Sequence, residues 1–205
     1  MKILCVSDRI DPLIYNEAVK LKFADTDLVL SAGDLPAEYL EYVKSALDKP
    51  LLFVHGNRHG CCRNKNQKEN SLNIDGKVRH EAGLVIAGLG GSMRYDKGEN
   101  QFSDFQMTIR MLKMFPALVY NRIFRGRFPD IFLTHASPRG IHDRDDKYHQ
   151  GYKCFLWFIK VFRPRYLVHG HIHHYDPEEP RVTRNNNTLV INACGHYLID
   201  TGENT

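Results

Sequence analysis

The sequence predicts an α/β fold in a single domain spanning residues 1–205. Short runs of Val, Ile, Leu and Phe recur along the chain, and segments with helical periodicity lie between several of them. The early order of strand, helix, strand, helix and strand indicates parallel βαβ units, whereas the later, more widely spaced strands require a second or mixed sheet. A length of 205 residues supplies one hydrophobic core but not two ordinary domains with a linker.

Seven apolar runs have the length and composition of buried strands. Each is bounded by Gly, Pro, Asp or Asn, the residues that commonly follow or precede a strand. The polar run Asn185–Asn187 predicts a hairpin turn. The predicted strands are Ile3–Val6, Leu28–Leu30, Leu51–Val54, Leu84–Leu89, Ile131–Leu133, Tyr166–Val168 and Leu189–Ile191.

Four segments carry helix start signals. Asp11 followed by Pro12 is typical of an N-cap and a first helical turn, and predicts a helix through Val19. The other three are predicted to begin at Pro36, at the capping box formed by Ser103 and Gln106, and at Cys154, where an aromatic helix runs to Phe162.

Composition excludes several classes of protein. No apolar stretch approaches the roughly 18 to 20 residues that cross a bilayer, and Asp8 comes too early for a secretory signal. We therefore expect a soluble, cytoplasmic protein with no membrane partner. Five cysteines are an odd number, and the adjacent Cys61 and Cys62 lack a second spaced pair, so neither a disulfide framework nor a zinc site is expected. The net charge of +4 suits a phosphorylated ligand but does not by itself predict nucleic-acid binding.

Five predicted strands are followed directly by residues that can bind a metal ion. In an open α/β sheet the carboxyl ends of the strands form the edge at which ligands bind, so these side chains are expected to converge. Taken singly, each Asp could cap a helix and each His could be a hydrogen-bonded loop residue. Their recurrence favours a shared site, made of Asp8, Asp34, Asn57, His135, His171 and His173.

Two carboxylates, one amide and three imidazoles form a mixed oxygen and nitrogen donor set, which suits Mn, Fe, Zn or Co. A carboxylate shared by two divalent ions can hold them about 3.5 to 4 Å apart, where they clamp the attacking and leaving oxygens of a phosphoryl group. Such ions also lower the pKa of bound water, so that hydroxide is available near neutral pH. Hydrolysis of a phosphate ester by a metal-bound hydroxide is the chemistry that this pattern predicts.

The ordered series Asp8, Gly33-Asp34, Gly56-Asn57, Thr134-His135 and Gly170-His171-Ile172-His173 resembles the sequence blocks of the calcineurin-like metallophosphoesterase family. The resemblance extends over most of the chain. It implies a four-layer α-β-β-α sandwich, with two mixed β-sheets facing each other and helices outside. It also implies that Asp8 and His173 belong to a first metal site, that Asp34 bridges, and that Asn57, His135 and His171 hold the second metal.

Two positions depart from that family's pattern. The family usually has a histidine two residues after the first Asp, where this chain has Ile10; Asp11 lies nearby, but its interpretation as a helix N-cap is stronger. The family also has a histidine after Gly-Asn that contacts phosphate and helps to protonate the leaving oxygen, where this chain has Arg58. Arg58 can bind and neutralise phosphate oxygens but cannot donate a proton at useful pH, so His59 is a candidate acid, against a reading as a solvent-exposed loop histidine.

The segment after His135 supplies further candidates. Because it begins at an expected metal ligand, it is expected to overhang the site. Arg139 could bind substrate phosphate, and His142 or His149 could be the acid or a substrate contact. The alternative is a surface loop whose charged residues pair with one another.

The function predicted best is that of a metal-dependent phosphoesterase acting on a phosphomonoester or phosphodiester, with two divalent ions, Mn being the most suitable. A phosphorylated small molecule is the expected substrate. A nuclease is an alternative, although Arg122, Arg125 and Arg127 near Phe124 and Phe128 make only a short basic and aromatic patch. A catalytically weakened scaffold on the same fold is a second alternative, which Ile10 and Arg58 favour.

Overall fold

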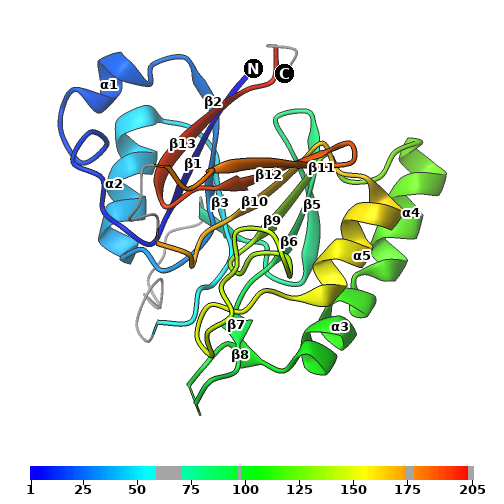
Figure 1. Ribbon diagram of the computed structural model, residues 1–205. Coiled ribbons are helices and arrows are strands. Elements are labelled where there is room, and N and C mark those ends of the chain that lie inside the picture. Colours follow the sequence, from blue (N-terminus) through cyan, green and yellow to red (C-terminus); the bar gives the residue numbers. More distant parts are fainter. Residues whose placement is uncertain (59–70, 97, 174–177, 203–205) are drawn as a thin grey trace.

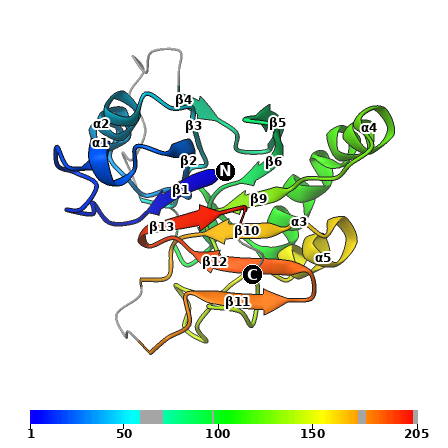
Figure 2. The ribbon, with the colours of Figure 1, turned by 90° about the horizontal axis from the view of Figure 1, so that it is seen from above.

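The computed structural model describes residues 1–58, 71–96, 98–173 and 178–202. Two sheets face each other, and helices cover the outer face of each, which gives the predicted four-layer α-β-β-α arrangement (Figures 1 and 2). Among the described residues, no helix combines the length and the apolar character that crossing a bilayer requires.

The first sheet has the strand order β13-β1-β2-β3-β4. Its neighbouring strands pair in parallel, except that β13 runs antiparallel to β1 with Lys2 opposite Asp200 and Ser7 opposite Gly195. The first sheet is therefore mixed. The strands are β1 (Lys2–Ser7), β2 (Thr26–Ser31), β3 (Leu51–Phe53), β4 (Ser71–Asn73) and β13 (Gly195–Asp200).

The second sheet has the strand order β11-β12-β10-β9-β6-β5. Its four inner strands are parallel, and the two edge strands are antiparallel to their neighbours. Asn186, in a left-handed conformation at φ 53°, lies in the predicted turn before β12. The strands are β5 (Lys77–Glu81), β6 (Leu84–Leu89), β9 (Ile131–Thr134), β10 (Tyr166–His169), β11 (Val182–Asn185) and β12 (Thr188–Asn192); a separate pair is formed by β7 (Ser92–Met93) and β8 (Gln101–Phe102).

The helices confirm three of the four predicted starts. Pro36 directly precedes α2 (Ala37–Leu47), and α5 (Lys153–Phe162) is the predicted aromatic helix. The capping box is present, because Ser103 accepts from the backbone N–H of Gln106 and the Gln106 side chain accepts in return from the N–H of Ser103. It opens α3 (Asp104–Lys113), which is followed by α4 (Phe115–Arg125).

The prediction of a helix that begins at Asp11 is wrong. Asp11 does cap a turn, since its Oδ1 accepts from the backbone N–H of Leu13 at 2.9 Å. Helix formation stops there because the side chain of Asn16 accepts from the N–H of Ala18, which offers the backbone a competing turn. The helix that this part of the chain does form is α1 (Val19–Lys22), one turn long.

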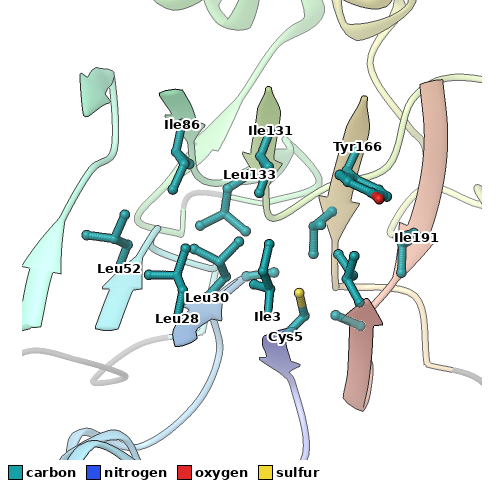
Figure 3. Close-up of a cluster of buried hydrophobic side chains, with 14 of the residues drawn as sticks. Ile3, Cys5, Leu28, Leu30, Leu52, Ile86, Ile131, Leu133, Tyr166 and Ile191 are labelled. Atoms are coloured by element: carbon teal, nitrogen blue, oxygen red, sulfur yellow. The ribbon is translucent and has the colours of Figure 1, made fainter. Parts of the chain in front are cut away.

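The main hydrophobic core lies between the two sheets (Figure 3). Alternate residues of a strand point to opposite faces, so Ile3 and Cys5 of β1 face the second sheet while Leu4 and Val6 pack under α1 and α2. A third cluster joins the second sheet to α3, α4 and α5. These three layers of contact fix the strand ends from which the candidate site is built.

Candidate metal centre

Three of the predicted ligands stand at strand ends in a strained backbone conformation. Asp8, Asp34 and His171 have φ values of 62°, 58° and 66°, in the left-handed region that residues with a side chain seldom adopt. Such residues persist only where the surrounding structure holds them, and they cluster at functional sites. Asp8 follows β1 directly, Asp34 lies three residues after β2, and His171 lies two residues after β10.

Glycines let these strand ends approach one another. A Cβ on Gly56 would lie 1.9 Å from Oδ1 of Asp34, and a Cβ on Gly170 would lie 2.4 Å from Oδ2 of Asp8. A glycine at such a position permits either unusual backbone angles or a close approach of another segment. For Gly56 and Gly170 the reason is the close approach of a second segment.

The convergence predicted from the strand ends is present at the centre of the site. Potential ligand atoms of Asp8, Asp34 and His135 lie within 4.8 Å of one another, and all three side chains are buried. Oδ2 of Asp8 accepts from the N–H of His171 at 2.9 Å, whereas Oδ1 is buried with no hydrogen-bond partner among the described residues. Burying an unpaired carboxylate oxygen is costly, and a divalent cation would remove that cost. The site therefore fits a metal ion.

Backbone and side-chain contacts orient the ligands of the second site. Nδ1 of His135 donates to the carbonyl oxygen of Ala32 at 2.7 Å, so Nε2 faces Asn57 Oδ1 at 2.9 Å and Asp34 Oδ2 at 3.4 Å. The amide of Asn57 donates to the hydroxyl of Tyr95 at 3.0 Å, which leaves Asn57 Oδ1 on the side of the cluster. Contacts of this kind fix ring and amide orientation around bound metals.

His171 presents a neutral imidazole. Its Nε2 lies 2.8 Å from the carbonyl oxygen of Tyr148, which can only accept, so Nε2 carries the proton and Nδ1 keeps its lone pair. Burial disfavours the charged form and lowers the pKa of His171 to about 3. The imidazole is therefore in the form that binds metal at every ordinary pH.

Asp34 and His135 form a charged pair in the metal-free protein. Burial alone would raise the pKa of Asp34, but the neighbouring His135 and Arg58 outweigh it, and the pKa falls to about 2. Burial alone would lower the pKa of His135, but the charge of Asp34 outweighs it, and the pKa rises to about 9. The pKa of Asp8 is raised by burial, its largest influence.

These pKa shifts predict how metal affinity depends on pH. Because the folded pKa of His135 is about 9, above its ordinary 6.5, a metal that takes Nε2 must displace a proton below pH 9. The apparent Kd for Mn²⁺ is expected to fall about tenfold per pH unit, or about 100-fold from pH 6.5 to 8.5. The charged pair stabilises the metal-free fold fully between pH 3.8 and pH 6.5, the ordinary pKa values of the two groups. That stability is lost as pH rises through 9, where His135 loses its proton, and as pH falls through 2, where Asp34 gains one.

Isothermal titration calorimetry in buffers of different ionisation enthalpy would count the proton that metal binding releases. The Tm of the metal-free protein, measured across this pH range, would report the stability that the Asp34–His135 pair contributes. An affinity that does not change with pH would contradict a protonated His135.

The residues expected to form the first metal site have a different arrangement. Ile10, at the position of the family histidine, is 47% exposed and offers no ligand atom. The guanidinium of Arg58 lies between two expected ligands: its Nη2 donates to Nε2 of His173 at 3.0 Å, and its Nε lies 3.7 Å from Oδ2 of Asp34. Asp11 makes its contacts elsewhere, because its Oδ2 lies 2.6 Å from Nδ1 of His196.

The loop candidates divide into two groups. Nε of Arg139 donates to the carbonyl oxygen of Gly151 at 2.9 Å, and the ring of His142 is hydrogen-bonded to His169 and Thr183. In this structure both side chains are therefore engaged with other residues of the protein. His149 lies at the site, with its ring centroid 5.5 Å from that of His171. A substrate contact stays a prediction for each of the three. His59, Cys61 and Cys62 lie outside the described residues.

Three groups that orient the ligands were not predicted from the sequence. Two are the backbone carbonyls of Ala32 and Tyr148. Every residue has a backbone carbonyl, so the residue type gives no signal of this role. The third is the hydroxyl of Tyr95, which accepts from the amide of Asn57. The ring of Tyr95 also packs against Tyr148, with centroids 5.0 Å apart.

Comparison with solved structures shows the same fold in other proteins. One crystal structure aligns with a TM-score of 0.64 at 12% identity, covering 98% of this chain and 95% of that one. The protein TT1561 of Thermus thermophilus aligns with a TM-score of 0.61 at 15% identity, covering 94% and 88%. A structure described as a novel archaeal phosphodiesterase aligns with a TM-score of 0.48 at 12% identity, covering 98% and 94%.

A search of curated proteins found no relative of significant similarity. A family model does match: the model of the calcineurin-like phosphoesterases covers residues 1–175, which include the six expected metal ligands. This match agrees with the four-layer fold and with the buried carboxylate and imidazole cluster at the strand ends. The chain belongs to the calcineurin-like phosphoesterase family.

Proposed function

We propose that the protein is a metal-dependent phosphoesterase that hydrolyses a phosphomonoester or a phosphodiester. The observation that carries the proposal is the buried cluster of Asp8, Asp34 and His135, in which one carboxylate oxygen has no partner among the described residues. Structural ion pairs do not leave a buried carboxylate oxygen unpaired, whereas a site for a cation does.

The residues present would hold two divalent cations of the Mn, Fe, Zn or Co type. Asp34 would be shared; the second site has Asn57, His135 and His171, and the first has Asp8 and His173. When bound, such ions polarise a phosphoryl oxygen and lower the pKa of water. The second site is expected to bind more tightly, because the first has Ile10 in place of a ligand and Arg58 competing for Nε2 of His173.

Arg58 would bind the phosphoryl group. Its side chain is about half exposed, at 53%, and its backbone N–H is anchored on Oδ1 of Asp34 at 3.0 Å. The guanidinium fork matches two phosphoryl oxygens and neutralises their charge. A phosphate ester that enters the site offers Arg58 these oxygens in place of its contact with His173.

The leaving oxygen needs a proton, and His149 is our first candidate to supply it. Nδ1 of His149 lies 2.8 Å from Oδ2 of Asp146, a contact that orients the ring and leaves Nε2 to donate. The ring stands beside His171, at the edge of the metal centre. His59, one residue after Arg58, is the other candidate acid from the sequence.

The test is hydrolysis of p-nitrophenyl phosphate, a monoester, and of bis(p-nitrophenyl) phosphate and diphenyl phosphate, both diesters, after reconstitution with Mn²⁺. We expect turnover that a chelator removes. In His149→Ala, loss of a general acid should cost about 100-fold or more for phenol, a poor leaving group. The loss should be much smaller for p-nitrophenol, which leaves without help. Lys147→Ala, an exposed change in the same loop, should behave as wild type.

The outcomes separate the candidate functions. A folded, metal-loaded protein without turnover on esters of either kind would contradict the proposal and favour the scaffold reading. Cleavage of oligonucleotides at rates far above those for small esters would indicate a nuclease. An equal loss of turnover on bis(p-nitrophenyl) phosphate and on diphenyl phosphate in His149→Ala would contradict proton donation by His149.

A further inference from the structure

The outer face of α4 is apolar. Tyr120, Ile123 and Phe124 are 55%, 69% and 69% exposed, whereas Leu118 and Asn121 on the opposite side are buried. The helix lies at the outer edge of the molecule in both views (Figures 1 and 2). A surface helix of a globular protein normally turns polar residues outward, so an apolar outer face indicates an interaction surface. We call Tyr120, Ile123 and Phe124 the α4 face.

A basic groove lies at the C-terminal end of α4. It has a volume of about 650 Å³ between the end of α4 and the end of α5. Four guanidinium groups and one carboxylate line it, those of Arg122, Arg127, Arg163, Arg165 and Asp130. We call the four arginines the arginine groove.

The arginines have donors to spare, and their surroundings carry a strong excess of positive charge. Arg122 donates to a backbone carbonyl at 2.8 Å and Arg127 donates to another at 2.7 Å, and a guanidinium has five N–H groups. A second nitrogen of Arg127 lies 3.6 Å from the carboxylate of Asp130. The sequence between Asp104 and Asp130 contains five basic residues and no acidic one. The groove therefore suits phosphate groups.

This surface is separate from the metal centre. The groove residues Asp130, Arg165 and Asn187 directly precede β9, β10 and β12, at the amino ends of those strands. The metal ligands follow the carboxyl ends, as His135 follows β9. A partner bound at the groove would therefore leave the metal centre open to its substrate.

We propose that the α4 face and the arginine groove dock the protein on an anionic phospholipid membrane. An apolar helix face with arginines at the end of the helix suits docking in the bilayer interface, with the apolar side chains at the acyl boundary and the cations at lipid phosphates. A nucleic acid would match the arginines and could stack a base on Phe124, but it would offer Ile123 no apolar partner. A second copy of this face would bring two arginine grooves together and is opposed by their charge.

The proposal replaces the expectation from the sequence that the protein has no membrane partner. That expectation rested on the lack of a segment long enough to span a bilayer, and docking in the interface needs none. It does not depend on the proposed phosphoesterase activity.

Vesicle sedimentation of the metal-loaded full chain in 0.1 M NaCl tests the proposal. We expect at least tenfold stronger partitioning onto phosphatidylcholine vesicles with 30% phosphatidylglycerol than onto pure phosphatidylcholine. The double variants Ile123→Ser/Phe124→Ser and Arg122→Glu/Arg163→Glu should each weaken binding to the anionic vesicles at least tenfold. Leu21→Ser, which removes an 84% exposed leucine from α1 in the opposite layer, should bind as wild type.

Folding and competing occupants are controlled in the same samples. Both double variants change surface side chains away from the metal centre, so their Tm and Mn²⁺ binding should match wild type. Protein that stays in solution with anionic vesicles would overturn the proposal, as would binding that Ile123→Ser/Phe124→Ser leaves unchanged. Tighter binding to an oligonucleotide than to the vesicles would overturn it in favour of nucleic acid. A dimer in light scattering that Ile123→Ser/Phe124→Ser dissolves would overturn it in favour of self-association.

Discussion

Replacing Asp34 with Asn is expected to lower Mn²⁺-dependent turnover by more than about 100-fold, the upper end for a residue that only supports a metal ligand. Asn has nearly the same shape, so the change removes charge rather than volume. Asp34 is the carboxylate that both expected sites share, and it is also the partner of His135 at 3.4 Å and of the Arg58 backbone at 3.0 Å. Losing its charge weakens both sites at once.

Metal-induced stabilisation gives a second measurement of the same change, one that needs no substrate. At about 100 times its Kd, a bound metal stabilises the folded state by about 2.7 kcal/mol, which raises the Tm of a protein of this size by about 5 to 10 °C. Asp34→Asn should show almost none of this shift. Glu41→Gln, an exposed carboxylate on α2, is the matched control and should keep both the shift and the turnover. An equal shift in Asp34→Asn would show that Asp34 is not a ligand.

Replacing Gly56 with Ala is expected to destabilise the protein by about 3 kcal/mol and to disrupt metal binding. The new Cβ would lie 1.9 Å from Oδ1, 2.4 Å from Cγ and 2.8 Å from the backbone nitrogen of Asp34. Asp34 cannot move aside easily, because it is buried and its backbone is held in a left-handed turn. Urea unfolding, with metal titration of the folded fraction, would measure both effects.

Gly83→Ala separates crowding from backbone strain. Gly83 has a φ of 78°, and a methyl group placed on its Cα would meet nothing within 4 Å, so alanine there costs only the left-handed backbone, roughly 1 to 2 kcal/mol. Gly56 has no positive φ, and its alanine variant meets only the crowding. Gly83→Ala should therefore be mildly destabilised with normal metal affinity. A Gly56→Ala variant that binds metal as wild type would contradict the close approach of Gly56 to Asp34.

The buried strands were predictable, whereas most of the half-exposed ones were not. β1 and β9 are buried on both faces, so each leaves a continuous apolar run in the sequence. β5, β11 and β13 are largely half-buried, and their residues mix charged, polar and apolar types without a run. The error at Asp11 has a similar local cause, since the competing bond from Asn16 to the chain depends on a side-chain conformation that no period reveals.

The centre of the site was predictable from topology. Parallel strands bring their carboxyl ends to one edge of a sheet, which places Asp8 beside Asp34. His135 follows β9 of the second sheet and joins them because the two sheets face each other. The contact between Arg58 and His173 was not predictable, because it depends on how two loops approach each other. Nor were the placements of Arg139 and His142, whose partners are set by the path of the loop after His135.

The pairing of β1 with β13 has a consequence for how the protein acquires its metal. Lys2 lies opposite Asp200, so the strand that carries Asp8 completes its ladder only with residues from the far end of the sequence. Contacts of such high sequence separation form slowly, and during synthesis that side of β1 stays unpaired until the last strand emerges from the ribosome. The bond from the N–H of His171 to Asp8 is expected to be fixed only after this step. Metal binding is therefore expected to follow the pairing of β1 with β13. The ion would then stabilise the completed fold rather than initiate its formation.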